Sequence, residues 1–395
     1  MRYRRFAIRL LIFATLTCVV SLSYLEYGKY RIASLEADCK VAYEAQQWVE
    51  LERLATEWIQ LEPDVALPWL YAAEAANVQG EEFRTASYLY HLPDNDPRSP
   101  PALLELSHLQ FGILNQPIAA AATCERILRI QPDAHEAHRR LIFYYAMSRQ
   151  RARLIAEARR AIQVGCDVPE TYLYLIGADW ITFTNGSDLN QRWLQSKPED
   201  ETFLVAQAFH LVRSSALSES MEEKEPDGRS KSERIMAELL ARFPHNKEIL
   251  TFHLDLACFR GKEDRVTELL AQAPSDSAED SRFWRFKGWV HNNRREFAEA
   301  ERAYLQALKL HPFDGQTLHS LAAVCRHNKD LERVDRYQSL AVLGKEIMRD
   351  CLQMPDTLSL SDELLQKMFL YADECGDALV ARRIREQLII SPQPP

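Results

Sequence analysis

Glycine is scarce in this chain of 395 residues, which contains only 12, and no two glycines lie within eight residues of one another. The glycine-rich patterns that cradle phosphates and the G-x-S-x-G turn that presents a catalytic serine are absent, and so is the H-E-x-x-H zinc motif. Strand-rich folds also need glycine at their tight turns. The scarcity therefore favours helices joined by short connections, as does the abundance of good helix formers.

Closely spaced cysteines are also lacking. The chain has eight, and neighbouring cysteines are never closer than 21 residues. Zinc sites and redox pairs normally contain a C-x-x-C, so we expect neither, and the wide spread is typical of small apolar packing residues. His135 and His138 lie three residues apart at an expected helix start, but no third ligand is nearby. We predict no metal site and no cofactor.

Titratable residues with catalytic spacing are missing as well. His253, Asp255 and Glu263 form a local group, but they are scattered among apolar positions without the spacing that acid-base chemistry requires. We therefore predict no catalytic residue and expect that the chain is not an enzyme.

Outside the N-terminal segment, acidic residues outnumber basic ones. The formal net charge is −9, and residues 1–30 contribute +4, so the remainder carries −13. Binding to nucleic acid requires clustered Lys and Arg with few competing carboxylates. We expect no nucleic-acid partner, although a local basic patch is compatible with this balance.

The N-terminal segment 1–31 is basic and then apolar. Four arginines precede residues 10–25, which carry no charge, and residues 6–25 together are long enough to span a bilayer. The arginine excess predicts a single-pass membrane protein with a cytoplasmic N-terminus and an extracytoplasmic body, which would be periplasmic in a bacterium. The alternative is cleavage near Ser21-Leu22-Ser23, which would make this segment a signal peptide and release a soluble exported protein.

Prolines mark a repeat in the body of the chain. Pro63, Pro97 and Pro132 are separated by 34 and 35 residues, a period typical of helix-turn-helix repeats. The clearest unit covers residues 281–314, and its pattern consists of Trp284, Gly288, Phe297, Ala300, Tyr304, Ala307 and Pro312. Small residues in this pattern let two helices cross closely, and the proline ends the second helix.

This pattern resembles the tetratricopeptide repeat family. The resemblance implies an all-α fold, a right-handed superhelical solenoid of helix pairs over residues 32–350, in which the best units are 281–314 and 315–348. We expect a mobile insertion at 218–232, terminal capping helices at 351–390 and a disordered tail at 391–395. The N-terminal transmembrane or signal helix would precede this array.

The resemblance also implies a binding surface, because the first helix of each unit in this family lines the concave face. The residues beside the packing positions are Arg282, Arg285, Trp289, Asn292 and Asn293 in one unit and Gln316, His319, Arg326 and His327 in the next. They predict a basic, partly aromatic patch suited to an acidic or phosphorylated protein segment. The alternative is that the arginines only solvate the surface and pair with Glu296, Glu299 and Glu301.

The function expected from the sequence is a non-catalytic protein-protein interaction scaffold or adaptor, held at the extracytoplasmic face of a membrane and binding a protein or peptide on its concave face. An alternative is a regulatory or substrate-presenting subunit of a separately encoded envelope enzyme or of an export or assembly complex.

Overall fold

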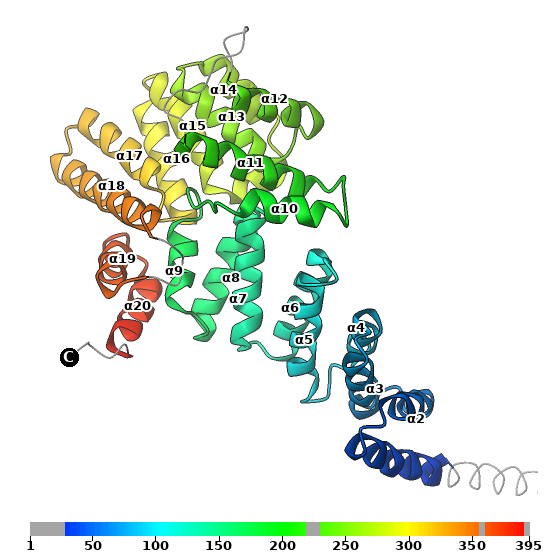
Figure 1. The fold of residues 1–395 in the computed structure, drawn as a ribbon. Coiled ribbons are helices and arrows are strands. Elements are labelled where there is room, and N and C mark those ends of the chain that lie inside the picture. Colours follow the sequence, from blue (N-terminus) through cyan, green and yellow to red (C-terminus); the bar gives the residue numbers. More distant parts are fainter. Residues whose placement is uncertain (1–27, 219–229, 355–359, 391–395) are drawn as a thin grey trace, which may run out of the picture. The chain divides into compact units, whose positions relative to one another are not determined.

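The computed structural model describes residues 28–218, 230–354 and 360–390. Within these ranges the regular structure is entirely helical and contains no strand, which confirms the predicted all-α class (Figure 1). The chain divides into two compact units, Met1–Gln131 and Pro132–Pro395, called unit 1 and unit 2 below.

Unit 1 consists of antiparallel helix pairs. A helix that includes residues 28–44 comes first. It is followed by α2 (Trp48–Leu61), α3 (Ala66–Val78), α4 (Glu82–Tyr90), α5 (Ser99–Phe111) and α6 (Pro117–Ile130). The core at its start is built from Leu35, Leu51, Leu54 and Trp58, all nearly inaccessible to solvent.

Unit 2 contains the remaining helices. They are α7 (His135–Met147), α8 (Arg151–Val164), α9 (Pro169–Ile176), α10 (Gly186–Leu194), α11 (Glu201–Ser218), α12 (Lys231–Arg242), α13 (Lys247–Phe259), α14 (Glu263–Ala271), the 3-10 helix η1 (Ser275–Glu279), α15 (Ser281–Asn293), α16 (Phe297–Leu310), α17 (Gly315–His327), α18 (Leu331–Leu352), α19 (Asp362–Glu374) and α20 (Ala378–Ile390).

The turn between the two helices of a pair repeats with the predicted period. In the turns before α2, α4, α6, α8, α14, α16 and α18, one residue has a positive φ and lies two residues before the second helix begins. These residues are Gln46, Gly80, Asn115 and Arg149, at spacings of 34, 35 and 34, and then Gly261, Arg295 and Lys329, at spacings of 34. The repeat of helix pairs is therefore confirmed by the backbone over residues 46–149 and 261–329, and among the described residues of the 169–280 region, where the sequence pattern is weak, Gly261 alone continues it.

The packing of the clearest unit follows the expected chemistry. A side chain at Gly288 on α15 would place its Cβ 2.5 Å from Cε1 of Tyr304 on α16, so only glycine allows this close crossing. Ala300 and Ala307 are fully buried in the same contact. The small residues of the sequence pattern thus set the distance between the two helices.

Unit 2 differs from an array in which each helix pair contacts only its neighbours. Arg383 on α20 pairs with Asp167, which precedes α9, at 2.7 Å, and Arg159 on α8 pairs with Asp377, which precedes α20, at 2.9 Å. Helix α20, which was expected to belong to the terminal cap, therefore packs back against α8 and α9, more than 200 residues earlier (Figure 1). Unit 2 is closed on itself by these contacts.

The predicted placement as a single-pass membrane protein is contradicted by the structure. A membrane-spanning helix is about 20 residues long and predominantly apolar. Across the three described ranges, no helix meets both conditions. Residues 6–25, to which the crossing was assigned, lie outside those ranges, as do most of the insertion 218–232 and the tail 391–395.

Candidate functional site

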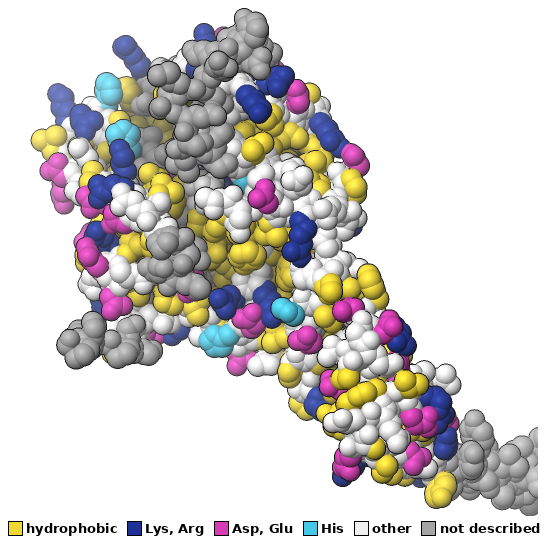
Figure 2. All heavy atoms as spheres, viewed as in Figure 1, with side chains coloured by type: hydrophobic (Ala, Val, Ile, Leu, Met, Phe, Trp, Pro, Cys, Tyr) yellow, Lys and Arg dark blue, Asp and Glu magenta, His cyan; other side chains and the backbone are white. Residues whose placement is uncertain are grey.

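Unit 2 contains a cavity of about 1090 Å³, which we call the unit 2 groove. It is lined by residues of α9, α11, α13, α15, α17, α18 and α19 and of the segments that precede α8, α10 and α17. Its aromatic lining includes Trp180, Phe209, Phe252, Phe259, Phe286 and Trp289. Figure 2 shows hydrophobic side chains gathered in the middle of the visible face of this unit.

Two large apolar side chains in the groove are exposed. Phe259, the last residue of α13, is 89% exposed, and Val342 on α18 is 51% exposed. Scattered apolar residues on a surface need no explanation, but exposed ones that line a concave site are typical of a binding surface. The groove therefore offers apolar anchors that the described residues do not themselves cover.

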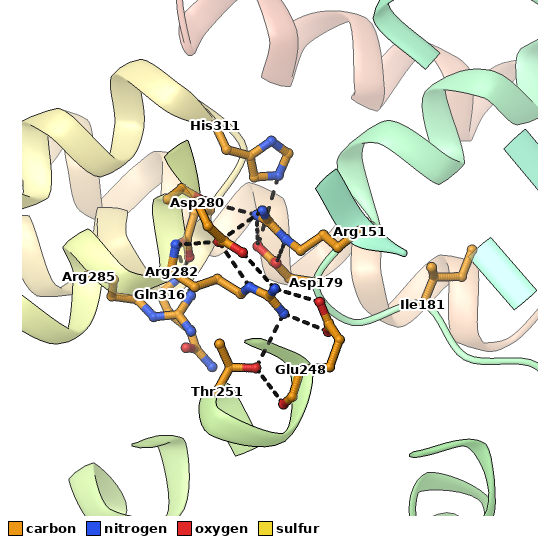
Figure 3. A network of polar contacts seen from close by, with 12 residues as sticks. Arg151, Asp179, Ile181, Glu248, Thr251, Asp280, Arg282, Arg285, His311 and Gln316 are labelled. Atoms are coloured by element: carbon orange, nitrogen blue, oxygen red, sulfur yellow. Dashed lines mark hydrogen bonds and ion pairs between the residues drawn. The ribbon is translucent and has the colours of Figure 1, made fainter. Parts of the chain in front are cut away.

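The floor of the groove is polar and its centre is Arg282. This side chain is 5% exposed and donates to Asp280 at 2.7 Å and to both carboxylate oxygens of Glu248 at 2.7 and 2.8 Å. Asp280 also accepts from the backbone N–H of Arg282, which fixes the start of α15. Figure 3 shows Arg282 between these two carboxylates.

The network extends from Arg282 to distant parts of unit 2. Arg151 on α8 donates to Asp280 at 3.3 Å, to Ser281 at 2.9 Å and, through two nitrogens, to Asp179 (Figure 3). Since Arg151 and Asp280 are 129 residues apart, these bonds hold the α15 end of the groove against α8.

Arg285 extends the floor toward α17. It donates to Asp314, the N-cap residue of α17, at 2.8 Å and to Asp255 at 3.4 Å. It is 7% exposed. Each of the two buried arginines on α15 therefore has carboxylate partners from the same unit.

The charges on this floor compensate one another. Burial opposes the ionisation of Asp280, but Arg282 and Arg151 outweigh it and hold the pKa of this carboxyl well below its usual range. Burial also opposes the charge of Arg282, while Asp280 and Glu248 raise its pKa. Both groups thus stay ionised, and the capacity of Arg282 to bind an external carboxylate is already used.

His311 borders this network without a hydrogen bond. It is 1% exposed, neither ring nitrogen has a hydrogen-bond partner, and its Nε2 lies 4.0 Å from Asp179. Burial, assisted by the charge of Arg151, lowers the pKa of His311 to about 4. The ring is therefore neutral near pH 7 and acts as an apolar packing group.

The structure brings together part of the predicted surface. Arg282, Arg285, Trp289, Gln316 and His319 line the groove. The remaining predicted residues, Asn292, Asn293, Arg326 and His327, do not line it. Asn293 donates to Glu263, Arg326 donates to Gln338 at 3.1 Å, and the ring of His327 stacks on Phe297 with centroids 3.9 Å apart.

The alternative pairing of the arginines also differs from the structure. Glu296 contacts His291 at 2.6 Å, Glu299 pairs with Arg302 at 2.9 Å, and Glu301 pairs with Arg333 at 2.6 Å. The carboxylates that neutralise Arg282 and Arg285 come instead from residues 248, 255, 280 and 314. At Arg282 and Arg285, the predicted basic patch is therefore a network in which carboxylates neutralise the arginines.

Sequence reasoning missed several residues of the groove. Phe259, Trp180 and Val342 line it, as does Lys345 on α18. Phe259 and Trp180 lie in the region where the repeat pattern is weak, and Val342 and Lys345 lie on the second helix of a pair. The signal that could have found Phe259 is a large aromatic residue directly before a turn with a positive-φ glycine, Gly261.

The residues considered for metal or redox chemistry have structural partners. His138 is fully buried and contacts Glu157 at 2.5 Å and the carbonyl oxygen of Pro132 at 2.9 Å. In the described part of the chain, no group of three His, Cys, Asp or Glu residues could hold a metal ion. Burial raises the pKa of the Cys258 thiol, which lines the groove, to about 12, so it is not a thiolate near pH 7.

Together, the periodic turns and the close crossing at Gly288 define a helical repeat protein built of tetratricopeptide-like pairs. No protein-family model matches the chain, and no curated protein sequence matches it. Among solved structures it is similar to the Cut9–Hcn1 hetero-tetramer of the APC/C, with a TM-score of 0.32 and 12% identity over 91% of this chain and 79% of that chain.

Two further structures show similar likeness. Yeast Tom70 has a TM-score of 0.28 and 14% identity over 92% of this chain and 77% of that chain. A tetratricopeptide repeat protein from Parabacteroides merdae has a TM-score of 0.27 and 12% identity over 74% of this chain and 98% of that chain. Likenesses this weak carry no argument, so the fold assignment rests on the geometry of the chain itself.

Proposed function

We propose that this chain is a non-catalytic protein-protein interaction scaffold or adaptor, and that the unit 2 groove binds a segment of its protein partner. The observation that carries the proposal is the aromatic lining of a large cavity, in which Phe259 is exposed and Trp289 is half-buried. Aromatic side chains are enriched among the residues that dominate protein interfaces, because they bury a large area at little cost in conformational entropy.

The groove has about the volume of the largest small-ligand pockets, about 1090 Å³ against about 300–1,000 Å³. We base the choice of a protein segment on the exposed Phe259 and Val342 in its lining. The compensated charges of its floor supply shape and a fixed polar surface rather than reactive groups, which is why we propose binding and not catalysis.

The predicted contact residues divide into two roles under this proposal. Trp289 and His319 meet the partner, together with Phe259. Arg282 and Arg285 hold the floor of the groove in shape, because their carboxylate partners already occupy them. Asn292, Asn293, Arg326 and His327 lie outside the groove lining and would contact only a partner that extends beyond it.

The proposal is tested by crosslinking and affinity purification of the full chain with paired variants. Phe259→Ala and Trp289→Ala remove anchors of the groove. Phe83→Ala is the matched control, because Phe83 is 72% exposed but belongs to α4 in unit 1. We expect one or more proteins to be recovered with the wild type and the control and lost with both groove variants. Identical recovery with all four chains would contradict the proposal.

A further inference from the structure

Helices α19 and α20 form a pair that lies outside the period of the array. Gly376 has a positive φ and lies two residues before α20, as the turn residues of the periodic pairs do. It follows Lys329 by 47 residues (376 − 329), which is 13 more than the spacing of 34 between Arg295 and Lys329. Part of this addition lengthens α18, which has 22 residues, whereas α16 has 14. The displaced pair reaches α8 and α9 (Figure 1).

This pair also supplies one wall of the unit 2 groove. Tyr371 on α19 lines the groove, is fully buried and donates to the carbonyl oxygen of Phe313 at 3.2 Å. Its hydroxyl group fits against Gly344 of α18, because a Cβ at that position would lie 2.7 Å from the hydroxyl oxygen. Phe313 and Gly344 line the groove as well. The wall is therefore complete on this side only while α19 stays in place.

The joint between this pair and helices α8 and α9 is polar, and we call it the seam. It consists of the ion pair of Arg159 with Asp377 at 2.9 Å and that of Arg383 with Asp167 at 2.7 Å. Gln387 also donates to the carbonyl oxygen of Asp167 at 3.1 Å. The side chains of the two arginines are 34% and 22% exposed, so water reaches both ion pairs.

A second long-range joint in unit 2 connects α8 with the start of α15 and differs from the seam in burial. Its ion pair joins Arg151 and Asp280, and both side chains are almost wholly buried. Breaking a buried ion pair costs more than breaking one that water reaches. Of these two joints, the seam is therefore the one that separates more readily, while the floor of the groove stays fixed.

From these contacts we propose that α19 and α20 form a lid on the unit 2 groove and that the seam holds this lid shut. When the seam separates, α19 withdraws Tyr371 from Phe313 and the groove opens on that side. When the seam closes again, the lid retains the protein segment that has entered. This inference rests on the proposed function and adds a regulation of the same site.

A lid of this kind has a kinetic signature. The seam is intact in the free and in the bound protein, so weakening it destabilises both closed states equally and leaves the affinity almost unchanged. The open state, through which the partner enters and leaves, becomes more populated. Entry and release should therefore accelerate together, whereas the loss of an ordinary contact would accelerate release alone.

The first test is hydrogen exchange of the full chain. We expect α19 and α20 to exchange together and faster than α13 and α15, because they open as a unit. Arg159→Glu turns the attraction to Asp377 into a repulsion and should raise exchange in α19 and α20 about ten-fold, with α13 and α15 unchanged. Arg159→Lys keeps the charge and should behave like the wild type. The control Arg302→Glu makes the same charge change at an exposed side chain of α16, away from the seam, and should alter neither pair of helices.

The second test measures the two rates with the photo-crosslinking amino acid p-benzoylphenylalanine at position 289. Irradiation at increasing times after mixing with cell extract gives the rate at which the crosslinked protein enters. Addition of excess chain without the photoprobe before irradiation gives the rate of release. Arg159→Glu should raise both rates by a similar factor, about ten-fold, and leave the amount crosslinked at equilibrium within about two-fold of the wild type. Arg159→Lys and Arg302→Glu should change neither rate.

Three results would overturn the proposal. Exchange in α19 and α20 that is no faster than in α13 and α15, or that Arg159→Glu leaves unchanged, would show that the pair does not open. Faster release without faster entry would show that the seam strengthens binding and does not gate it. If position 289 gives no crosslinked protein in any chain, the proposed function fails and the regulation fails with it, while the exchange data decide separately whether the pair opens.

Discussion

Replacing Arg282 by alanine should destabilise unit 2 severely. Arg282 is 5% exposed and neutralises two carboxylates, Asp280 and Glu248, through charge-assisted hydrogen bonds of 2.7–2.8 Å. Removing one partner of a buried pair leaves uncompensated charge and costs about 3–5 kcal/mol. Some compensation remains, because Arg151 still contacts Asp280 at 3.3 Å and Arg149 lies 3.8 Å from Glu248. We therefore expect the free energy of unfolding to fall by about 3 kcal/mol, the lower end of that range.

The assay is urea denaturation of the full chain followed by far-UV circular dichroism, with hydrogen exchange of α13 and α15 to locate the loss. The matched control is Arg302→Ala, because Arg302 pairs with Glu299 at 2.9 Å but its side chain is 75% exposed, so its removal should cost less than about 0.5 kcal/mol. The reasoning is refuted if Arg282→Ala and Arg302→Ala unfold at the same urea concentration, or if exchange rises equally in helices far from the groove.

Three further predictions concern the stability of the helix pairs and of their buried polar groups. Lys329→Gly should raise the free energy of unfolding by about 1 kcal/mol, because Lys329 has a φ of 59°. The same change at Lys309, in the last turn of α16, should lower it by about 0.5 kcal/mol. Urea denaturation compares the two variants, and equal effects would contradict the account. Gly288→Ala should lower the free energy of unfolding by about 1–3 kcal/mol, because the new Cβ overlaps the buried ring of Tyr304. A melting temperature equal to that of the wild type would contradict this prediction and show that the ring can move aside. The free energy of unfolding should fall as the pH drops from 6.5 toward 4, because the unfolded chain then binds a proton at His311 while the folded chain does not. The variant His311→Leu should show a smaller fall, by about 3 kcal/mol. Parallel pH profiles of unfolding free energy for the two proteins would reject this prediction.

The sequence was sufficient to predict the helix pairs because their determinants are local. The proline spacing and the pattern around Gly288 and Tyr304 reflect contacts between adjacent helices, and adjacent helices are close in sequence. The same logic explains why the closure of unit 2 was not predicted. The pair of Arg383 with Asp167 joins residues 216 apart, and no periodic signal marks such a contact.

The candidate site was predicted in part for a related reason. The resemblance led to Arg282, Arg285, Trp289 and His319 as contact residues, and these four line the groove, whereas their contact with a partner stays a prediction. The charge of that face could not be read from the spacing, because Glu248 and Asp314, which neutralise the arginines, belong to other helix pairs. Lys345, an exposed lysine of the groove lining, lies on the second helix of a pair, where the resemblance gave no reason to look.

The most direct test of the central claim places a photo-crosslinking amino acid, p-benzoylphenylalanine, at position 289 in the groove or at position 83 in unit 1 of the full chain. If the groove binds a protein segment, irradiation should give a discrete crosslinked partner from position 289 and none of that species from position 83. A partner that crosslinks only from position 83, or equally from both positions, would contradict the claim that the unit 2 groove is the binding site.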